Sequence, residues 1–356
     1  MLIKKSLNIL PNLILPHDYL TYNNTIKKET QYKYFSTCVL ITNTNDMYNL
    51  IDYIFWHLNI CKFDHILIIN NNNEQNYNNI KLVISLFDST KVTFITDNNP
   101  LYKIHSKIVN SFSSKYIMFI DDDEFLYISD KFKSINDILE HHIDYFKYSI
   151  NWVHFFNNKL LKTFDTRYNS YINTFKYYYL KTEYKDIKFN LVKTIYSTEL
   201  NHHILSDNIK TITVPSFLNT VTTTWNEIKP FTVHNGLTIF NNNILPSYNL
   251  TNYKINYNYD NADINDINIE NSDIFLAHYK YTAINKIIYK LNKNRDYISI
   301  AKKSYNINYN INKILDLYNS LNNTVLKYND VLSIKYNKYK NEILTLKTSY
   351  ANQEKE

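Results

Sequence analysis

The sequence predicts an α/β fold in which a mainly parallel sheet is flanked by helices. Three observations support this prediction. Short apolar runs alternate, through the first half of the chain, with longer segments in which apolar residues recur at helical spacing. The runs are bounded by asparagine, aspartate and charged residues, which favour turns and helix caps. Alternation of strands and helices in this way is typical of βαβ units, whose strands pair in parallel.

Four apolar runs in the first half are predicted strands, because each is too short to form a helix. Residues 43–46 follow the first run and supply a turn with a helix cap. The predicted strands are residues 37–42, 66–69, 91–95 and 116–120, and the helices between them are residues 47–60, 77–87 and 102–112.

The second half is less regular, and only a few of its elements are predicted. These are a helix at residues 134–146, a strand at 150–156 and a helix at 282–291. The predicted organisation is an irregular leader at 1–33, one domain at 34–300 with an Asn- and Asp-rich insertion at 241–272, and a helical, partly disordered tail at 301–356.

The charge and glycine content exclude several classes of protein. The 356 residues carry a net charge of +6, with lysines and arginines spread along the chain, which indicates an anionic ligand only weakly and argues against nucleic acid as a partner. The chain contains one glycine, so it has no G-x-G-x-x-G or Walker loop. Rossmann dehydrogenases and P-loop NTPases are therefore disfavoured.

Cysteine usage and hydropathy indicate the cellular compartment. Cys38 and Cys61 are the only cysteines, which disfavours a disulfide framework or a cysteine-based zinc site. No signal peptide and no transmembrane segment is predicted, and we therefore expect a cytoplasmic protein, in the host cytoplasm if the gene is viral. The high content of Asn, Ile and Lys is typical of an AT-rich genome.

Four acidic residues, 121–124, directly follow the predicted strand at 116–120. Ligands of open α/β sheets bind at the carboxyl ends of strands. If the chain stays extended, Asp121 and Asp123 project to one side and offer oxygen ligands suited to Mg²⁺ or Mn²⁺. The alternative is a solvated acidic turn with a helix cap. Mutual repulsion among the carboxylates favours a cation at this position.

Five segments, in the same order along the chain, resemble motifs of the glycosyltransferases grouped as family 92 and of their family-2-like relatives. The most specific is residues 119–126, which is similar to the D-x-D-E-F-L signature of that family. The other segments are Asn45-Asp46 with 56–58 and 63–66, residues 152–157, Lys193–Ile195 followed by His202-His203, and His278-Tyr279 before a lysine-rich helix. Together they span residues 37–295.

The resemblance implies a GT-A fold and a set of site residues. Asp123 corresponds to a direct ligand of Mn²⁺ or Mg²⁺, and Asp121 to a second ligand or a ribose contact. A histidine from the second half completes such a site, and the candidates are His203, His202 and His278. The positions implied to contact the nucleotide or its diphosphate are Asn45, Asp46, Asn70, Asp121, Lys193 and His278.

The chain departs from the family pattern at some of these positions. Asn70-Asn71 stands where the family has Asp-Asn, Asp46 replaces a glutamate, and the family glycines are missing. Asparagine still forms hydrogen bonds with a base, so the first change alters nucleotide contacts without removing them.

The implied reaction moves a sugar from a nucleotide-sugar donor, by family habit a UDP-sugar, to a hydroxyl of a glycan or protein acceptor. Inversion at the sugar carbon is implied, and this requires a carboxylate base. The candidates for this base are Glu183, Asp186 and Glu199, and nothing in the pattern selects among them. Two other readings stay open: a metal-dependent nucleotidyl or phosphoryl transferase, and a non-catalytic descendant that binds a nucleotide or a glycan.

Overall fold

The computed structural model describes most of the predicted sheet and the C-terminal helices. The residues that it describes are 32–42, 44–71, 76–99, 104, 107–108, 111–141, 147–157, 161–178, 192–198, 269, 271–279, 283–286 and 327–355, together with the short strands between 212 and 256.

The strands include all four that the first half predicts. In chain order they are β1 (Tyr34–Thr42), β2 (His65–Asn70), β3 (Val92–Thr96), β4 (Ser114–Phe119), β5 (Glu124–Ile128), β6 (Lys147–Phe156), β7 (Tyr177–Tyr178), β8 (Val192–Ser197), β9 (Ile212–Pro215), β10 (Thr220–Thr223), β11 (Ile239–Phe240), β12 (Asn243–Ile244), β13 (Ser247–Asn249), β14 (Lys254–Asn256), β15 (Ile274–His278) and β16 (Lys327–Tyr328).

The helices lie between the strands and at the C-terminal end. They are α3 (Met47–Phe55), which continues into the π-helical turn η1 (Trp56–Ile60), α4 (Tyr77–Ile84), α6 (Ile135–His141), α7 (Tyr171–Thr174), α13 (Val331–Lys338) and α14 (Lys340–Gln353). Two further predicted helices, at 102–112 and 282–291, are described in part. Their described helical residues include Lys107 and Ile108 of the first and residues 284–286 of the second.

The parallel part of the sheet has the strand order β3-β2-β1-β4. β1 is central: its Cys38 is paired in parallel register with Ile66 of β2 on one side and with Met118 of β4 on the other. All six residues of β2 are buried, as expected for a parallel strand covered on both faces. The α/β prediction, with a mainly parallel sheet and flanking helices, is confirmed.

Beyond β4 the sheet becomes mixed. β8 is antiparallel to both β4 and β6, and β15 is antiparallel to β5 and parallel to β6. β5 was not predicted from the sequence, because this strand begins at Glu124, inside an acidic segment whose residues favour a turn. β5 matters for the site because its pairing with β15 brings His278 opposite Glu124.

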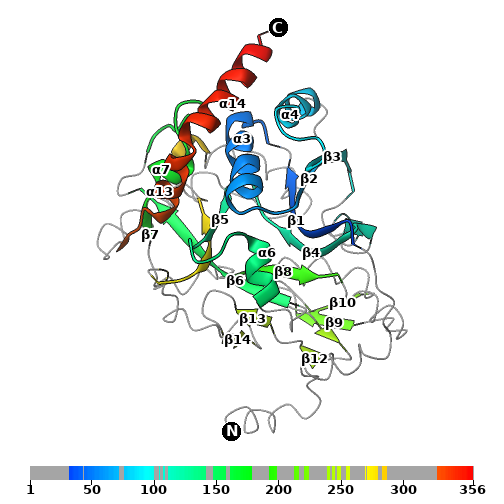
Figure 1. Ribbon diagram of the computed structural model, residues 1–356. Helices are drawn as coiled ribbons and strands as arrows, with labels where there is room; N and C mark the ends of the chain where they lie inside the picture. Colours follow the sequence, from blue (N-terminus) through cyan, green and yellow to red (C-terminus); the bar gives the residue numbers. More distant parts are fainter. Residues whose placement is uncertain are drawn as a thin grey trace.

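Figure 1 shows α3, α4 and α14 together at one side of the sheet, in the upper part of the view. α3 begins at Asp46, whose side chain accepts a hydrogen bond from the backbone N–H of Asn49, as the sequence predicts. α14 packs against α3, although its sequence is polar. Residues 340–353 belong to the tail that is predicted to be helical and partly disordered, and they form a helix.

An aromatic cluster lies under the acidic segment and fixes the position of β5. The ring of Phe125 makes edge contacts with Tyr53, Trp56 and Tyr279 at centroid distances of 6.3, 6.1 and 5.8 Å. The indole N–H of Trp56 donates to the backbone oxygen of Leu126 at 2.7 Å. Aromatic pairs of this kind add about 0.5–1.5 kcal/mol each beyond the area that they bury. The aromatic cluster thus packs against β5 and holds the acidic segment in a fixed position.

The predicted leader and insertion lie largely outside the described residues, so the domain boundaries stay a prediction. Among the described residues, none of the helices has the length and apolar character needed to cross a membrane.

Candidate functional site

The carboxyl ends of β1 and β4 meet at the point where the strand order of the parallel sheet reverses. From β1 the chain proceeds through α3 to β2 and then outward to β3, and it returns to place β4 on the other side of β1. Connections on the two sides diverge at such a switch point and leave a crevice, which is where open α/β sheets bind ligands. Residues 44–46 follow β1 and residues 120–123 follow β4, so both predicted segments lie at this switch point.

The acidic segment is a hydrogen-bonded turn. The N–H of Glu124 donates to the backbone oxygen of Asp121 at 3.1 Å, and the N–H of Asp121 donates to Oε2 of Glu124 at 2.8 Å. The expectation that alternate side chains along an extended strand bring Asp121 and Asp123 to one side is therefore wrong. The strand ends at Phe119, and the two aspartates occupy different environments.

Helix α3 holds this turn from one side. The side-chain amide of Asn49 donates to the backbone oxygen of Asp122 at 2.6 Å, and the hydroxyl of Tyr53 donates to the backbone oxygen of Ile120 at 3.1 Å. Both donors come from buried residues, so the turn is fixed relative to the helix that follows β1. The acidic turn is thus a rigid feature of the fold.

Lys193 supplies a positive charge to the acidic turn. It lies on β8, next to β4, and its side chain is 1% exposed. Its Nζ lies 3.0 Å from Oδ2 of Asp121 and 3.1 Å from Oε2 of Glu124. Burial by itself lowers the pKa of Lys193, but the two carboxylates outweigh it and raise that pKa. The predicted role of Lys193 was to balance phosphate charge, and in the structure it balances two protein carboxylates.

Glu124 is the most deeply buried acid of the turn. Its side chain is 0% exposed, and burial raises its pKa well above the usual range of a glutamate, against the attraction of Lys193. Among the described residues, Oε1 of Glu124 has no hydrogen-bond partner and is buried. This residue was not among the predicted site residues, although the D-x-D-E-F-L signature contains it.

Asp123 faces His278. Nε2 of His278 lies 3.4 Å from Oδ2 of Asp123, and both side chains are nearly buried. The pairing of β5 with β15 places His278 there, and the N–H of Tyr279 donates to the backbone oxygen of Asp123 at 2.9 Å. The ring of His154 lies 4.8 Å from that of His278. The structure thus brings together two predicted site residues that are far apart in the sequence.

The described partners of the acidic turn divide its carboxyl groups into two sets. Asp121 and Glu124 both lie beside the ammonium of Lys193, and Asp123 lies beside the imidazole of His278. The turn therefore presents a carboxylate next to a histidine nitrogen, separate from the carboxyl groups that Lys193 holds.

The donor set of Asp123 and His278 fits a divalent cation only in part. An oxygen and a nitrogen ligand close together suit Mn²⁺, which accepts both types. Among the described residues, however, no group of three or more His, Cys, Asp or Glu side chains converges to hold a metal ion. The predicted ligand His203 lies outside the described residues, and water and a bound diphosphate are the other ligands that such a cation commonly has in nucleotide sites.

The other predicted contacts of the nucleotide lie at the ends of β1 and β2. Asn45 is exposed, and Asn70 is buried, with its backbone oxygen accepting from the N–H of Asp97 at 3.0 Å. The side-chain amide of Asn71 donates to the backbone oxygens of Asp97 and Asn99 at 2.7 and 3.0 Å. These contacts tie the ends of β2 and β3 together, which is a structural role.

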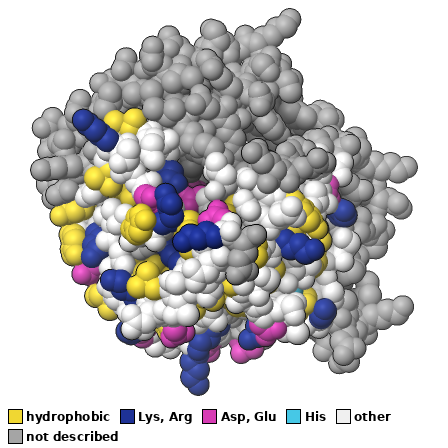
Figure 2. Space-filling view, turned by 90° about the horizontal axis from the view of Figure 1, so that it is seen from above, with side chains coloured by type: hydrophobic (Ala, Val, Ile, Leu, Met, Phe, Trp, Pro, Cys, Tyr) yellow, Lys and Arg dark blue, Asp and Glu magenta, His cyan; other side chains and the backbone are white. Residues whose placement is uncertain are grey.

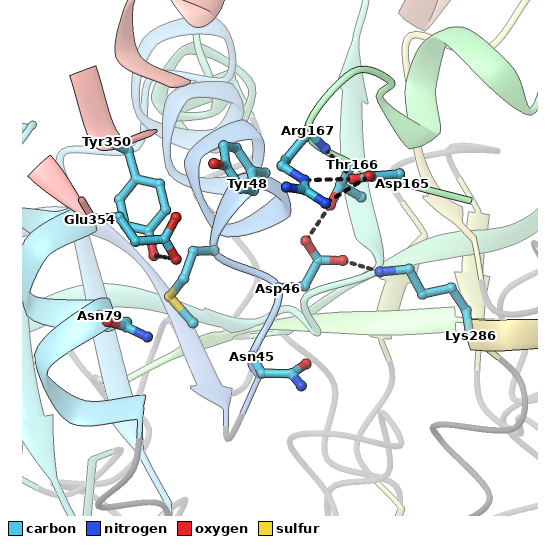
Figure 3. A pocket seen from close by; sticks show the side chains of 11 residues that line it. Asn45, Asp46, Tyr48, Asn79, Asp165, Thr166, Arg167, Lys286, Tyr350 and Glu354 are labelled. Carbon is cyan, nitrogen blue, oxygen red and sulfur yellow. Dashed lines mark hydrogen bonds and ion pairs between the residues drawn. The ribbon is translucent and has the colours of Figure 1, made fainter. Parts of the chain in front are cut away.

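Asp46 lies at a small pocket that opens beside the first turn of α3 (Figure 3). In addition to capping α3, its carboxylate accepts from the hydroxyl of Thr166 and pairs with the ammonium of Lys286. The pocket has a volume of about 250 Å³, and its lining residues are Asn45, Asp46, Met47, Tyr48, Asn79, Asp165, Thr166, Arg167, Lys286, Tyr350 and Glu354.

Most of this lining could not be found from the sequence. Asn45 and Asp46 were predicted, and Lys286 belongs to the lysine-rich segment after His278-Tyr279. The loop at 165–167 and the end of α14 carry no motif, so only the tertiary structure identifies them as neighbours of Asp46. His202, His203 and the candidate bases Glu183, Asp186 and Glu199 lie outside the described residues.

Comparison with protein-family models gave no match, and comparison with curated protein sequences gave none either. Solved structures gave matches at low similarity. One is described as a glucose-1-phosphate thymidylyltransferase from Bacillus anthracis in complex with a sucrose, with 11% identity, a TM-score of 0.28, and coverage of 49% of this chain and 75% of that chain. Another is TarS 1–349 from S. aureus, with 13% identity, a TM-score of 0.27, and coverage of 56% of each chain.

At these TM-scores the likeness carries no argument about function, and the chain spans just over half of the TarS structure. The class of the fold follows from the topology of the sheet. The protein has an α/β fold with a mainly parallel sheet, flanked by helices, and a buried acidic turn at its switch point.

Proposed function

We propose that this protein is a glycosyltransferase that uses a nucleotide-sugar donor and a divalent cation. The observation that carries the proposal is the partly buried cluster at the switch point, where Asp123 lies beside His278 and where Asp121 and Glu124 share Lys193. The location supports a nucleotide ligand, and the adjacent oxygen and nitrogen ligands of Asp123 and His278 support a divalent cation. The resemblance of residues 119–126 to the D-x-D-E-F-L signature adds sugar transfer as the reaction.

Asp123 and His278 are the residues that would hold the cation. When bound, Mn²⁺ or Mg²⁺ supplies a Lewis acid that offsets the charge of the diphosphate. Asp121 has a different role: its side chain is 48% exposed, and Lys193 holds one of its oxygens. The resemblance implies a ribose contact for this residue, and an exposed carboxylate can accept from a ribose hydroxyl.

The rigid turn supports catalysis by fixing these groups before the donor binds. Asn49, Tyr53 and Lys193 hold the backbone and the carboxylates of residues 120–124. Preorganised polar groups do not have to reorient when charge develops on the leaving diphosphate. The proposal includes inversion at the transferred sugar carbon and a glycan or protein acceptor. The candidates for the carboxylate base that this reaction needs are Glu183, Asp186 and Glu199.

The test is release of UDP from UDP-sugars by the full chain, with and without Mn²⁺. We expect release that requires the cation and is lost in Asp123→Asn. Asp130→Asn is the matched control, since it makes the same chemical change at an exposed position beside Lys335. Circular dichroism spectra of both variants establish that they are folded.

Two outcomes would overturn the proposal. Release of pyrophosphate from a nucleoside triphosphate and a sugar phosphate, without turnover of any nucleotide sugar, would assign the site to nucleotidyl transfer. Binding of UDP with Mn²⁺ and no turnover of any donor in a broad screen by mass spectrometry would assign the chain to the non-catalytic class.

A further inference from the structure

The pocket beside Asp46 is walled by parts of the chain that are distant in sequence. Figure 3 shows side chains from the start of α3, from α4, from the loop at 165–167 and from the end of α14 around one space. The volume, about 250 Å³, is below the usual range for drug-sized ligands and is suited to a small molecule such as a single sugar ring.

Both cations of the pocket are paired with carboxylates. Lys286 is bound to Asp46, and Nη2 of Arg167 lies 3.2 Å from Oδ2 of Asp165. In Figure 2, some basic and acidic side chains also lie next to one another near the middle of the face. Glu354 adds a third carboxylate to a lining with two cations, so the pocket disfavours phosphates.

The remaining polar groups suit hydroxyl groups. Glu354 is exposed, and the hydroxyl of Tyr350 donates to its Oε1 at 3.3 Å, which leaves further acceptor capacity on the carboxylate. Asn45 and Asn79 each offer an amide that both donates and accepts. A hydroxyl group also donates and accepts, so a ligand rich in hydroxyls satisfies such a lining without bringing a charge.

An aromatic ring completes the pocket. Tyr48 is half-buried at the wall, and its ring packs at 88° against the buried ring of Tyr350, with 5.3 Å between the centroids. This contact fixes the ring of Tyr48, and a fixed ring offers an apolar surface to the C–H face of a sugar. Tyr350 is itself fully buried, so it supports Tyr48 and does not contact the ligand with its ring.

We propose that this pocket binds an uncharged saccharide ring, in place of the nucleotide contact that the resemblance implies for Asn45 and Asp46. Its place in catalysis, as the site of the acceptor sugar, rests on the proposed function, whereas binding of the saccharide does not. The pocket is linked to the acidic turn through the first turn of α3: Asp46 accepts from the N–H of Asn49, and the side chain of Asn49 donates to Asp122. The pocket and the candidate donor site therefore share one rigid element.

The experiment is saturation-transfer NMR on the full chain, without nucleotide or metal. The probes are methyl glycosides of glucose, galactose, mannose and N-acetylglucosamine, and glucose 6-phosphate is the anionic comparison. We expect transfer to the ring protons of at least one methyl glycoside and none to glucose 6-phosphate. The signal is lost in Tyr48→Leu, and the affinity falls about tenfold in Glu354→Gln, because one charged hydrogen-bond acceptor is removed.

The matched control is Glu342→Gln, which makes the same change on the first turn of α14, outside this pocket. It leaves the signal unchanged. Asn79→Ala, which removes an amide of the lining, is a further variant that weakens binding and keeps the test decisive if Tyr48→Leu does not fold. No transfer to any methyl glycoside overturns the inference, and so does a signal that is equal in wild type, Tyr48→Leu and Asn79→Ala.

A titration with UDP and Mn²⁺ on the same samples separates this inference from the proposed function. If the methyl glycosides bind and UDP does not, the saccharide pocket stands and the transferase proposal fails. If UDP binds and is unaffected by the pocket variants while no glycoside binds, the pocket inference fails alone.

Discussion

Asp52 of α3 and Lys347 of α14 form a buried ion pair, with 2.9 Å between Oδ2 and Nζ, although 295 positions separate them in the sequence. The hydroxyl of Tyr336 donates to the other oxygen of Asp52 at 3.0 Å, and Nζ of Lys347 also donates to the backbone oxygen of Thr166 at 3.0 Å. This cluster anchors both C-terminal helices, and it holds the loop that carries Thr166 against Asp46.

Lys347→Met should lower the free energy of unfolding by about 3–5 kcal/mol, because it leaves the carboxylate of Asp52 buried without its cation. Urea denaturation monitored by circular dichroism measures this change. Lys338→Met, at an exposed lysine on α13, is the control and should change stability by less than about 1 kcal/mol. Equal effects of the two substitutions would mean that the buried pair does not anchor α14.

The stability contributed by Asp52 should depend on pH. Burial, which outweighs the attraction of Lys347, raises the pKa of Asp52 from 3.8 to about 6. The folded state therefore holds this proton more tightly than the unfolded chain, so the contribution is full below pH 3.8 and is lost as the pH rises through about 6. The shift corresponds to about 3 kcal/mol.

The measurement is the free energy of unfolding of wild type minus that of Asp52→Asn, taken at a series of pH values. We expect this difference to fall between about pH 4 and pH 7, since the asparagine does not titrate. A difference that rises with pH over this range would show that the pair with Lys347 dominates over burial and lowers the pKa of Asp52.

Lys193→Met should destabilise the protein by several kcal/mol, because Asp121 and Glu124 would lose their shared cation in a buried site. Adding Glu124→Gln should restore part of the loss, since it removes the most deeply buried carboxylate of the turn. A double-mutant cycle in urea measures this coupling. If the two losses simply add, Lys193 does not balance the charge of Glu124.

The cation and the nucleotide should bind cooperatively. A diphosphate that binds the same cation as Asp123 and His278 adds ligands to it, so UDP should strengthen the binding of Mn²⁺ by at least about tenfold. Isothermal titration of Mn²⁺, with and without UDP, measures this. His278→Ala should abolish the cooperativity, whereas His141→Ala, at an exposed histidine, should preserve it. An affinity for Mn²⁺ that UDP leaves unchanged would contradict a shared site.

The sequence was sufficient for the parallel half of the fold. The apolar runs that form β1, β2, β3 and β4 are local signals, because a strand buried on both faces must be apolar along its length. The cap at Asp46 and the acidic segment after β4 are also local, and the rule that ligands bind at the carboxyl ends of strands placed them near the site.

Other elements were missed because their stability comes from distant partners. β5 begins with a glutamate whose buried carboxylate is stabilised by the distant Lys193, and α14 has few apolar residues and depends on the pair of Lys347 with Asp52. Neither partner can be recognised from the residues adjacent in sequence. The local pattern at both places is polar and predicts a turn or a disordered end.

By itself, the sequence determined the class of the fold and the segment that contains the acidic side chains. The reason is that an apolar run in a buried strand and apolar residues at helical spacing are patterns that extend over only a few residues. The tertiary structure decided which charges meet: Lys193 with Asp121, His278 with Asp123, and Lys286 with Asp46. These pairings depend on strand register and on helix docking, which bring together residues from opposite ends of the chain, so no local pattern can specify them.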